Sequence, residues 1–169
     1  IRLSLVGSEM CIRDRNEIFD RVESILMGSD SMDMPYFYRD GLSSPNDNGF
    51  SFGNTIWQTD SGQCDSHLFN ALCIPIISRL SMKELIRIKV NCYTRQTEQI
   101  QSEYHQDFMY PHRVGIYCIN TCDGYTQFKN GDTAPSIANT LYLFDGYDLH
   151  ASVNQTDSNL RVNLNINYI

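Results

Sequence analysis

A histidine and an aspartate stand two positions apart in the stretch EYHQDFM, residues 103–109. In an extended strand successive side chains alternate between faces, so His105 and Asp107 would project from one face while Gln106 points away. An imidazole and a carboxylate side by side are suited to holding a metal ion. The pattern alone is weak, because a His-x-Asp triplet arises by chance in about 30% of chains of this composition.

A third candidate ligand, His150, follows Asp145-Gly146 and begins a β-rich run. The chain between His105 and His150 is long enough to return to the first pair in a rolled antiparallel sheet. Two histidines and one aspartate on one side of a metal leave adjacent positions open for a cosubstrate and dioxygen, as in non-haem Fe(II) oxygenases. By itself, His150 is equally consistent with a surface or hydrogen-bonded histidine.

The last β-rich run, RVNLNINY at residues 161–168, alternates strictly between polar and apolar residues. The simple interpretation is a half-exposed strand whose polar side faces water. The alternative is that Arg161 forms a bidentate pair with a carboxylate that enters the same barrel as the histidines. The polar residues of the run are Arg161, Asn163, Asn165 and Asn167.

The elements that must position these residues are helices followed by strands. Apolar residues recur at helical spacing over residues 16–27, with Gly28 as a stop, and a second helix is predicted over 66–79, kinked or restarted near Pro75. Residues 29–63 are rich in Ser, Asp, Gly and Asn but also in aromatic residues. We expect an ordered, irregular segment there that wraps the core, with PYFYRDG as a candidate lid or substrate wall.

After residue 80 seven or eight short β-rich runs are expected, separated by the turn dipeptides Asp123-Gly124, Asn130-Gly131 and Asp145-Gly146, which suit tight hairpins. Helices followed by closely spaced strands predict a mainly β fold with N-terminal helices, a jelly-roll or sandwich. The expected strands include ELIRIKVNCYT, RVGIYCIN, YTQFK, NTLYLFD, HASVN and LRVNLNINYI.

The charge and hydropathy of the chain argue against several classes of binding surface. The net charge of −7 and the pI near 4.9 argue against a general nucleic-acid or anionic-membrane surface, and no apolar run is long enough to span a bilayer. Cysteine spacing lacks a C-x-x-C pair, so we expect free thiols and a cytoplasmic location; a bridge between Cys118 and Cys122 is the alternative. His67 is expected to pack on the second helix, and His112 to be a solvated loop residue or to lie at the rim of the substrate entrance.

The first fifteen residues are treated separately. LVGSEMCIRD, from Leu5 to Asp14, looks like a translated transposase sequencing adapter. Residues 1–15 are therefore predicted not to be native, and residues 16–169 to form one domain. Within it, residues 16–80 would give helical and irregular support to a β core at 81–169.

Four segments together resemble the Fe(II)/2-oxoglutarate-dependent oxygenases, and among them the small prolyl-4-hydroxylase-like proteins of phages, viruses and marine bacteria. They are HQD at 105–107, IYCINTCDGYTQF at 116–128, ANTLYLFDGYDLH at 138–150 and RVNLNINY at 161–168. The resemblance covers nearly everything after residue 16. It implies a double-stranded β-helix, the cupin-like jelly-roll, as the fold.

The same resemblance implies the roles of individual residues. His105, Asp107 and His150 would bind iron, and Arg161 would bind the distal carboxylate of 2-oxoglutarate. Tyr93, on an earlier strand, would face the cosubstrate or the substrate; a sheet-packing tyrosine is the alternative. At two further positions the resemblance is also informative. Cys118 replaces a tyrosine that commonly helps to hold 2-oxoglutarate in the family. Thr126 matches a family threonine that we expect to be structural.

The activity implied is hydroxylation with dioxygen, in which 2-oxoglutarate is oxidatively decarboxylated to succinate and carbon dioxide. Ascorbate is a further cofactor candidate. A prolyl residue in a peptide is the first substrate class to consider, and no residue of the sequence selects a peptide over a small molecule. Two other hypotheses stay open: a non-enzymatic jelly-roll binding module, and a cupin-like metalloenzyme that does not use 2-oxoglutarate.

Overall fold

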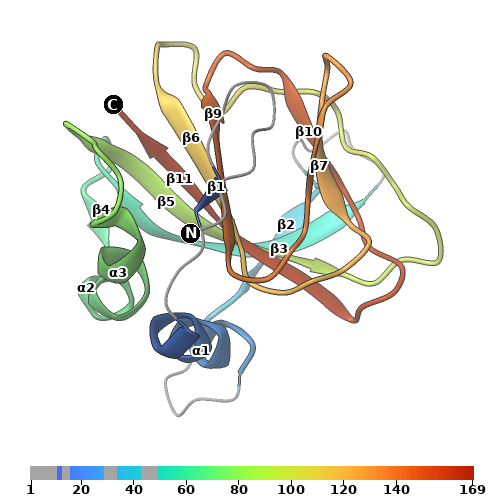
Figure 1. Cartoon of the computed structure of the whole chain (residues 1–169), viewed down its shortest axis with the longest axis horizontal. Coiled ribbons are helices and arrows are strands. Elements are labelled where there is room, and N and C mark those ends of the chain that lie inside the picture. Colours follow the sequence, from blue (N-terminus) through green and yellow to red (C-terminus); the bar gives the residue numbers. More distant parts are fainter. Residues whose placement is uncertain (1–10, 13–15, 29–33, 43–48) are drawn as a thin grey trace.

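Two antiparallel β-sheets face each other in the computed structural model, with helices packed against the larger one (Figure 1). The structure describes residues 11–12, 16–28, 34–42 and 49–169. The larger sheet has the strand order β1-β9-β6-β11-β5-β3-β2, with β4 paired to β3, and the smaller has the order β10-β7-β8. The strands are β1 (Cys11–Ile12), β2 (Phe37–Asp40), β3 (Phe50–Gln58), β4 (Gln63–Cys64), β5 (Leu85–Thr94), β6 (Arg113–Cys118), β7 (Tyr125–Phe128), β8 (Thr133–Pro135), β9 (Thr140–Asp145), β10 (His150–Val153) and β11 (Leu160–Tyr168).

The helices lie where the sequence predicts them. Helix α1 (Asn16–Leu26) is followed by Gly28 at φ +78°, a left-handed conformation that favours glycine. The second helical stretch consists of α2 (Ser66–Leu68), a π-helical turn η1 (Phe69–Cys73) and α3 (Ile74–Ile77). The π turn comes directly before Pro75, which lacks the N–H that a regular helix would use there. None of the described helices has the length and apolar character of a membrane span.

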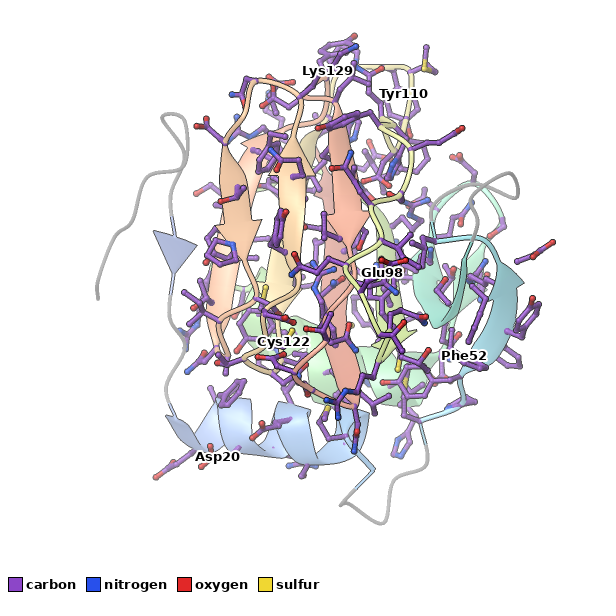
Figure 2. All side chains as sticks on the ribbon, turned by 90° about the vertical axis from the view of Figure 1, so that its right-hand side faces the viewer. Asp20, Phe52, Glu98, Tyr110, Cys122 and Lys129 are labelled. Atoms are coloured by element: carbon purple, nitrogen blue, oxygen red, sulfur yellow. The ribbon has the colours of Figure 1, made fainter. Side chains whose placement is uncertain are left out.

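The main hydrophobic core lies between the helices and the larger sheet. Val22 and Ile25 of α1 and Leu72 of the second helical stretch belong to one buried cluster with Ile88 of β5 and Leu164 of β11. Figure 2 shows α1 lying across the ends of the strands, with Asp20 directed away from them. Because one face of β5 and β11 is committed to this core, their alternate residues must face the smaller sheet.

The opposite face of β5 and β11 is polar, and it is buried between the two sheets. The strands pair antiparallel over nine positions that include Tyr93 with Arg161 and Asn91 with Asn163. Of the two interpretations of this run, the water-facing one is wrong, since the polar side of β11 is enclosed, with Arg161 1% and Asn167 0% exposed. A polar interior of this kind has to be satisfied by internal hydrogen bonds or by a ligand. The mainly β, jelly-roll fold expected from the sequence is confirmed, and the strictly two-residue period of β11 has its cause here.

The expectation of an irregular segment over residues 29–63 is wrong for the described part of that stretch. β3 pairs with β5 through Phe52–Cys92 and neighbouring positions, and β2 adds the edge of the sheet. β3 was not predicted because it contains Gly53, and glycine within a run usually indicates a turn or a weak strand. A side chain at Gly53 would place its Cβ 2.8 Å from the Val90 carbonyl oxygen, so the glycine permits the close pairing. Residues 29–33 and 43–48 lie outside the described residues.

Only one of the three predicted hairpin turns joins paired strands. Asn130-Gly131 connects β7 to β8, with Gly131 at φ +98°. Asp123-Gly124 and Asp145-Gly146 instead lead from the larger sheet to the smaller, from β6 to β7 and from β9 to β10. The hairpin prediction is therefore confirmed at Asn130-Gly131 and wrong at the other two dipeptides, because turn residues do not reveal whether the chain folds back on the same sheet or crosses to the other. The crossings are what bring the start of β10 over the polar face of β5 and β11.

Candidate metal centre

His105 and His150 are held side by side by their own backbone. They form an isolated antiparallel bridge in which each residue's N–H donates to the other's carbonyl, at 3.0 and 3.1 Å. The ring centroids are 4.6 Å apart. His150 opens β10 as predicted, whereas the His-x-Asp segment is an extended loop joined to β10 by this bridge and not a strand. The loop is fastened a second time by Gln106, whose side-chain amide donates to the Tyr147 carbonyl at 2.6 Å.

Each of the two imidazoles has one nitrogen next to a backbone carbonyl. His150 Nδ1 lies 2.9 Å from the Asp148 oxygen, and His105 Nδ1 lies 3.3 Å from the Glu103 oxygen. A neutral imidazole that donates from Nδ1 keeps the Nε2 lone pair for a metal. Burial lowers the pKa of His150, which favours this neutral form.

Asp107 completes the cluster and is held by three donors. An Arg87 guanidinium N–H donates to Oδ1 at 2.6 Å, while the amides of Asn165 and Asn167 donate to Oδ2 at 3.0 and 2.9 Å. Burial alone would raise the pKa of this carboxyl, but Arg87, His150 and the two amides together hold it below its usual range. The carboxylate is therefore ionised and fixed in orientation. Arg87 is fixed in turn by the Asn167 side-chain oxygen at 3.1 Å.

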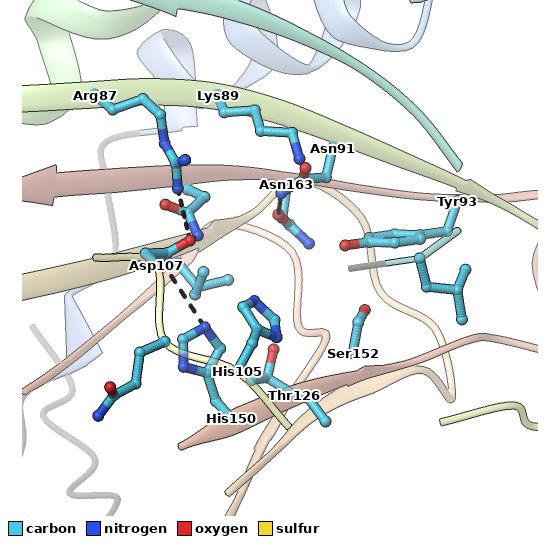
Figure 3. Close-up of a pocket in the computed structure, with 15 residues that line it drawn as sticks. Arg87, Lys89, Asn91, Tyr93, His105, Asp107, Thr126, His150, Ser152 and Asn163 are labelled. Atoms are coloured by element: carbon cyan, nitrogen blue, oxygen red, sulfur yellow. Dashed lines mark hydrogen bonds and ion pairs between the residues drawn. The ribbon is translucent and has the colours of Figure 1, made fainter. Parts of the chain in front are cut away.

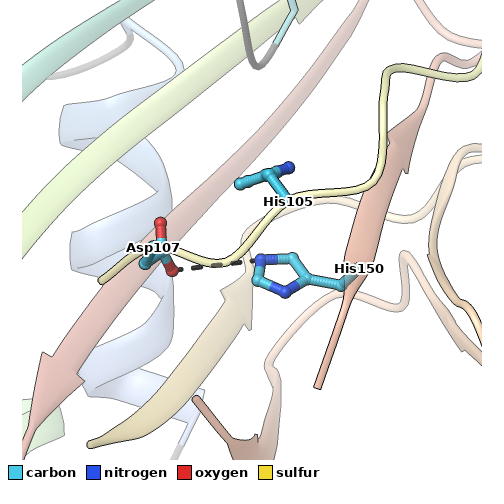
Figure 4. Close-up of side chains that lie close together, drawn as sticks. All are labelled: His105, Asp107 and His150. Carbon is cyan, nitrogen blue, oxygen red and sulfur yellow. Dashed lines mark ion pairs between the residues drawn. The ribbon is translucent and has the colours of Figure 1, made fainter. Parts of the chain in front are cut away.

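The donor set fits a divalent transition metal. Ligand atoms of His105, Asp107 and His150 lie within 4.8 Å of one another, and His150 Nε2 and Asp107 Oδ2 are 3.9 Å apart (Figure 4). Two neutral imidazoles and one carboxylate are the donors that Fe(II) sites of the facial type use. The three residues that the sequence singled out thus meet in space, and they could hold such an ion.

Arg161 is buried at the other end of the same inner face. Its guanidinium donates to Ser152 Oγ at 2.8 Å, to the Val153 carbonyl at 3.3 Å and to Thr126 Oγ1 at 3.3 Å. Its central carbon lies 5.2 Å from the centroid of the Tyr93 ring. Within the described part of the chain no carboxylate pairs with this cation, and its buried Nε has no hydrogen-bond partner. A buried cation without a counter-ion is costly, which points to an anionic ligand.

A polar cavity of about 250 Å³ joins the metal candidates to the surroundings of Arg161 (Figure 3). Tyr93 lines it, as expected, and so do Thr126 and Ser152, which separate Arg161 from the open space. Thr126 was expected to be structural; its contact with Arg161 gives it a place at the site as well. Cys118, by contrast, is buried in a second apolar cluster and does not line the cavity.

Sequence reasoning missed one side of this cavity. Arg87, Lys89 and Asn91 precede Tyr93 at every second position of β5, and all four line the cavity. The signal was available, because RIKVNCY alternates polar and apolar residues just as RVNLNINY does. The full lining comprises Leu42, Arg87, Lys89, Asn91, Tyr93, His105, Gln106, Asp107, Ile116, Thr126, His150, Ala151, Ser152, Asn163 and Asn165.

The other two histidines behave differently from the expectation. His112 is buried, 5% exposed, because its ring packs on Gly146, where any Cβ would come within 2.2 Å of the ring. It does not line the cavity. His67, expected to pack, is exposed on α2. Cys118 and Cys122 are both free thiols and form no bridge in the structure; the other free thiols are Cys64, Cys73 and Cys92.

No protein-family model matches the sequence, and no curated protein matches it. Solved structures do share the fold. A prolyl-4-hydroxylase from Pseudomonas putida is 12% identical, with a TM-score of 0.55, and covers 89% of this chain and 87% of its own. A Trichoplax adhaerens prolyl hydroxylase, solved with a hypoxia inducible factor peptide, is 16% identical, with a TM-score of 0.59 and coverages of 94% and 82%.

A third similar structure is the viral collagen prolyl hydroxylase of Paramecium bursaria Chlorella virus-1, solved with 2-oxoglutarate. It is 12% identical, with a TM-score of 0.56, and covers 95% of this chain and 96% of its own. At these identities the likeness establishes the fold. The function has to be argued from the site itself.

Proposed function

We propose that the protein is an Fe(II)- and 2-oxoglutarate-dependent dioxygenase that hydroxylates its substrate. One observation carries the proposal: two histidines and an aspartate line a cavity that extends to Thr126 and Ser152, and these two residues contact a buried guanidinium, Arg161, that no described carboxylate neutralises. His105, Asp107 and His150 would hold the iron. The three prolyl hydroxylases of similar fold support the same assignment.

Arg161 would bind the distal carboxylate of 2-oxoglutarate. Its guanidinium is already oriented by Ser152 and Thr126 and faces the Tyr93 ring, so little side-chain freedom remains to be lost on binding. A bidentate guanidinium–carboxylate pair in a buried site is both strong and directional. Tyr93 would contribute the wall of the cosubstrate site next to Arg161.

When bound, iron supplies the redox chemistry that converts dioxygen, 2-oxoglutarate and a C–H bond into succinate, carbon dioxide and a hydroxylated product. The protein's own residues bind and position. The backbone bridge between His105 and His150 sets the spacing of the two imidazoles, and Arg87 with the two asparagines sets the plane of the Asp107 carboxylate. Two ordered sheets around the cavity limit the access of bulk water.

For the primary substrate, a prolyl residue in a peptide is the class to test first, because two of the solved neighbours are named as hydroxylases of peptides or collagen. A small-molecule substrate is the alternative. We place the enzyme in the cytoplasm, since its described cysteines, including the exposed Cys64, are free thiols. Ascorbate would serve, where needed, to keep the iron reduced.

Succinate formation tests the proposal. Full-length protein is incubated with Fe(II), 2-oxoglutarate, ascorbate and a panel of prolyl peptides and free amino acids, and compared with Asp107→Ala and His150→Ala. We expect succinate from the wild type and at least a 100-fold loss in both variants, because removing one ligand breaks the metal site. His67→Ala, which removes an exposed histidine outside the cavity, is the matched control and should keep full activity. Activity that survives in Asp107→Ala would refute the proposal.

A further inference from the structure

Lys89 is a cation of the cavity lining to which the described part of the chain offers no partner. It lies on β5, lines the cavity, and makes no hydrogen bond or ion pair with any described residue. The nearest acidic group that acts on it is Asp107, whose two oxygens are already taken by Arg87, Asn165 and Asn167. In Figure 3 the Lys89 side chain points into the cavity above the Asn91–Asn163 pair.

The surroundings of Lys89 are positive. Arg87 follows the same face of β5, and Arg39 of β2 approaches from the other side, where Gly53 leaves room for both stems: a Cβ there would lie 3.2 Å from Arg39 Nε and 3.4 Å from Lys89 Cε. Among the described residues that line the cavity, Asp107 is the only acidic one. A cationic cavity in a chain of net charge −7 is selective for anions.

Burial makes the charged form of the Lys89 ammonium energetically unfavourable. Burial lowers the pKa of Lys89 to about 8, with Arg39 and Arg87 lowering it further and Asp107 opposing them. The group is therefore still mostly protonated at pH 7, although it is partly desolvated and unpaired. Such an arrangement is destabilising unless a ligand supplies the missing negative charge.

Strand register separates this position from the site of Arg161. Lys89 pairs with Asn165, which holds Asp107, whereas Tyr93 pairs with Arg161. Lys89 and Tyr93 are four residues apart on one strand, about 13 Å at 3.3 Å per residue. A cosubstrate whose far carboxylate binds Arg161 would therefore leave Lys89 beside the metal, on the side of the cavity toward β2 and Leu42.

We infer that Lys89 binds a carboxylate of the primary substrate, next to the metal centre. The inference rests on the proposed function and selects its small-molecule alternative: a small carboxylic acid, such as a free amino acid, and not an internal prolyl residue, which has no carboxylate near the oxidised carbon. The side-chain amides of Asn91 and Asn163 lie beside Lys89 on the same face and can fix the orientation of such an acid.

Matched acids and amides test the inference. L-proline with L-prolinamide, N-acetyl-L-proline with its amide, and pentanoate with pentanamide are titrated calorimetrically into anaerobic full-length protein loaded with Fe(II) and 2-oxoglutarate. In the wild type we expect at least one acid to bind about tenfold more tightly than its amide, as expected for one charge-assisted hydrogen bond. The preference should disappear in Lys89→Met and persist in Lys89→Arg.

Controls separate the outcomes. Lys83→Met removes an exposed lysine outside the cavity and should retain the preference. Lys89→Gln, which keeps a polar side chain, replaces Lys89→Met if circular dichroism shows that the latter is unfolded. The inference is overturned if no acid binds better than its amide in the wild type, or if Lys89→Met weakens 2-oxoglutarate as strongly as Arg161→Ala does, since Lys89 would then serve the cosubstrate. Failure of the wild type to bind 2-oxoglutarate at all would instead refute the proposed function.

Discussion

The position of Asp107 depends on side chains that are not themselves proposed metal ligands. Its carboxylate accepts from one guanidinium and two amides, so its position is set by three side chains on β5 and β11. Ligands oriented in this way bind metal more tightly than free side chains, because less freedom is lost and no rearrangement is needed. These donors would therefore matter to metal affinity at the proposed site although none of them would touch the ion.

Arg87→Met should weaken Fe(II) binding. The substitution keeps an unbranched apolar stem but removes the 2.6 Å contact to Asp107 and leaves one carboxylate oxygen without its donor. We expect a loss of about 10- to 100-fold in metal affinity, the usual effect of removing a residue that orients a ligand. Anaerobic titration with Fe(II) in competition with a chelator measures it, and Arg113→Met, outside the cavity, is the control. Unchanged affinity would show that Asn165 and Asn167 suffice.

Lys89→Met should stabilise the metal-free protein at pH 7. The folded pKa of about 8 lies below the unfolded value near 10.5, so protonation favours the unfolded chain; the wild type carries this penalty in full below pH 8 and loses it between pH 8 and 10.5. The difference in unfolding free energy between variant and wild type should therefore shrink over that range. Urea unfolding at pH 7 and pH 10 tests this, and a difference independent of pH would contradict it. Arg39, Arg87 and Asp107 are the charged groups that act on Lys89.

The sequence predicted some of these residues and not others for a physical reason. His105, Asp107, His150 and Arg161 have few common roles in a β-rich chain when they recur in this order, so their types and spacing were informative. Lys89 and Arg87 were missed because a charged residue at alternate strand positions usually faces water. Only the second sheet, which covers that face, makes them part of a site.

Strand β11 lies between β5 and β6 in the middle of the larger sheet and divides two tasks between its faces. Ile166 is 0% exposed and belongs to the core beneath the helices, while Asn165 donates to Asp107 on the other side. One strand thus connects the stability of the fold to the geometry of the site. Its alternation was readable in the sequence; which face was the core was not.

Neighbouring substitutions on β11 should separate the two tasks. Ile166→Ala should lower the free energy of unfolding by about 2–5 kcal/mol, with Ile166→Val costing about 1 kcal/mol, because a cavity opens in a packed core. Asn165→Ala should change stability less but weaken Fe(II) binding about tenfold or more. Chemical denaturation and Fe(II) titration of the same three proteins measure both quantities. Equal losses of stability and metal affinity in all three would show that the two faces are not independent.

The secondary-structure prediction succeeded for some elements and failed for others. The helices and the strands from β5 onward were predicted close to their observed bounds, because their periodicities are clear, except for the three-residue strand β8, which no predicted run covers. β2 and β3 were not predicted, since Gly, Ser and Asn within β3 resemble a loop, and β3 pairs with the distant strand β5 while β2 pairs only with β3. Pairing over such distances supplies the stabilisation that local propensity lacks.

The molecule as a whole places two cationic positions at the two ends of one polar cavity, with the candidate metal centre near Lys89. This follows from two crossings between sheets, at 123–124 and 145–146, which carry β7 and β10 over the inner face of β5 and β11. The sequence predicted the jelly-roll class from the number of strands and their turns. It could not predict which turns cross, and hence the shape of the cavity, because crossing is decided by the packing of distant strands.

The prediction that residues 1–15 are not native remains a prediction; of these, Cys11–Ile12 pair with β9 in the structure.

An anaerobic titration of Fe(II)-loaded, full-length protein with 2-oxoglutarate, followed by visible absorption, tests the proposed chemistry most directly. We predict a metal-to-ligand charge-transfer band from chelated 2-oxoglutarate in the wild type, reached at a concentration at least tenfold higher in Arg161→Ala, because the distal carboxylate loses its buried partner. Lys83→Met should titrate like the wild type. Iron binding without a band would favour a metalloenzyme that does not use 2-oxoglutarate, and absence of iron binding would leave a jelly-roll binding module; either result would contradict the proposed dioxygenase.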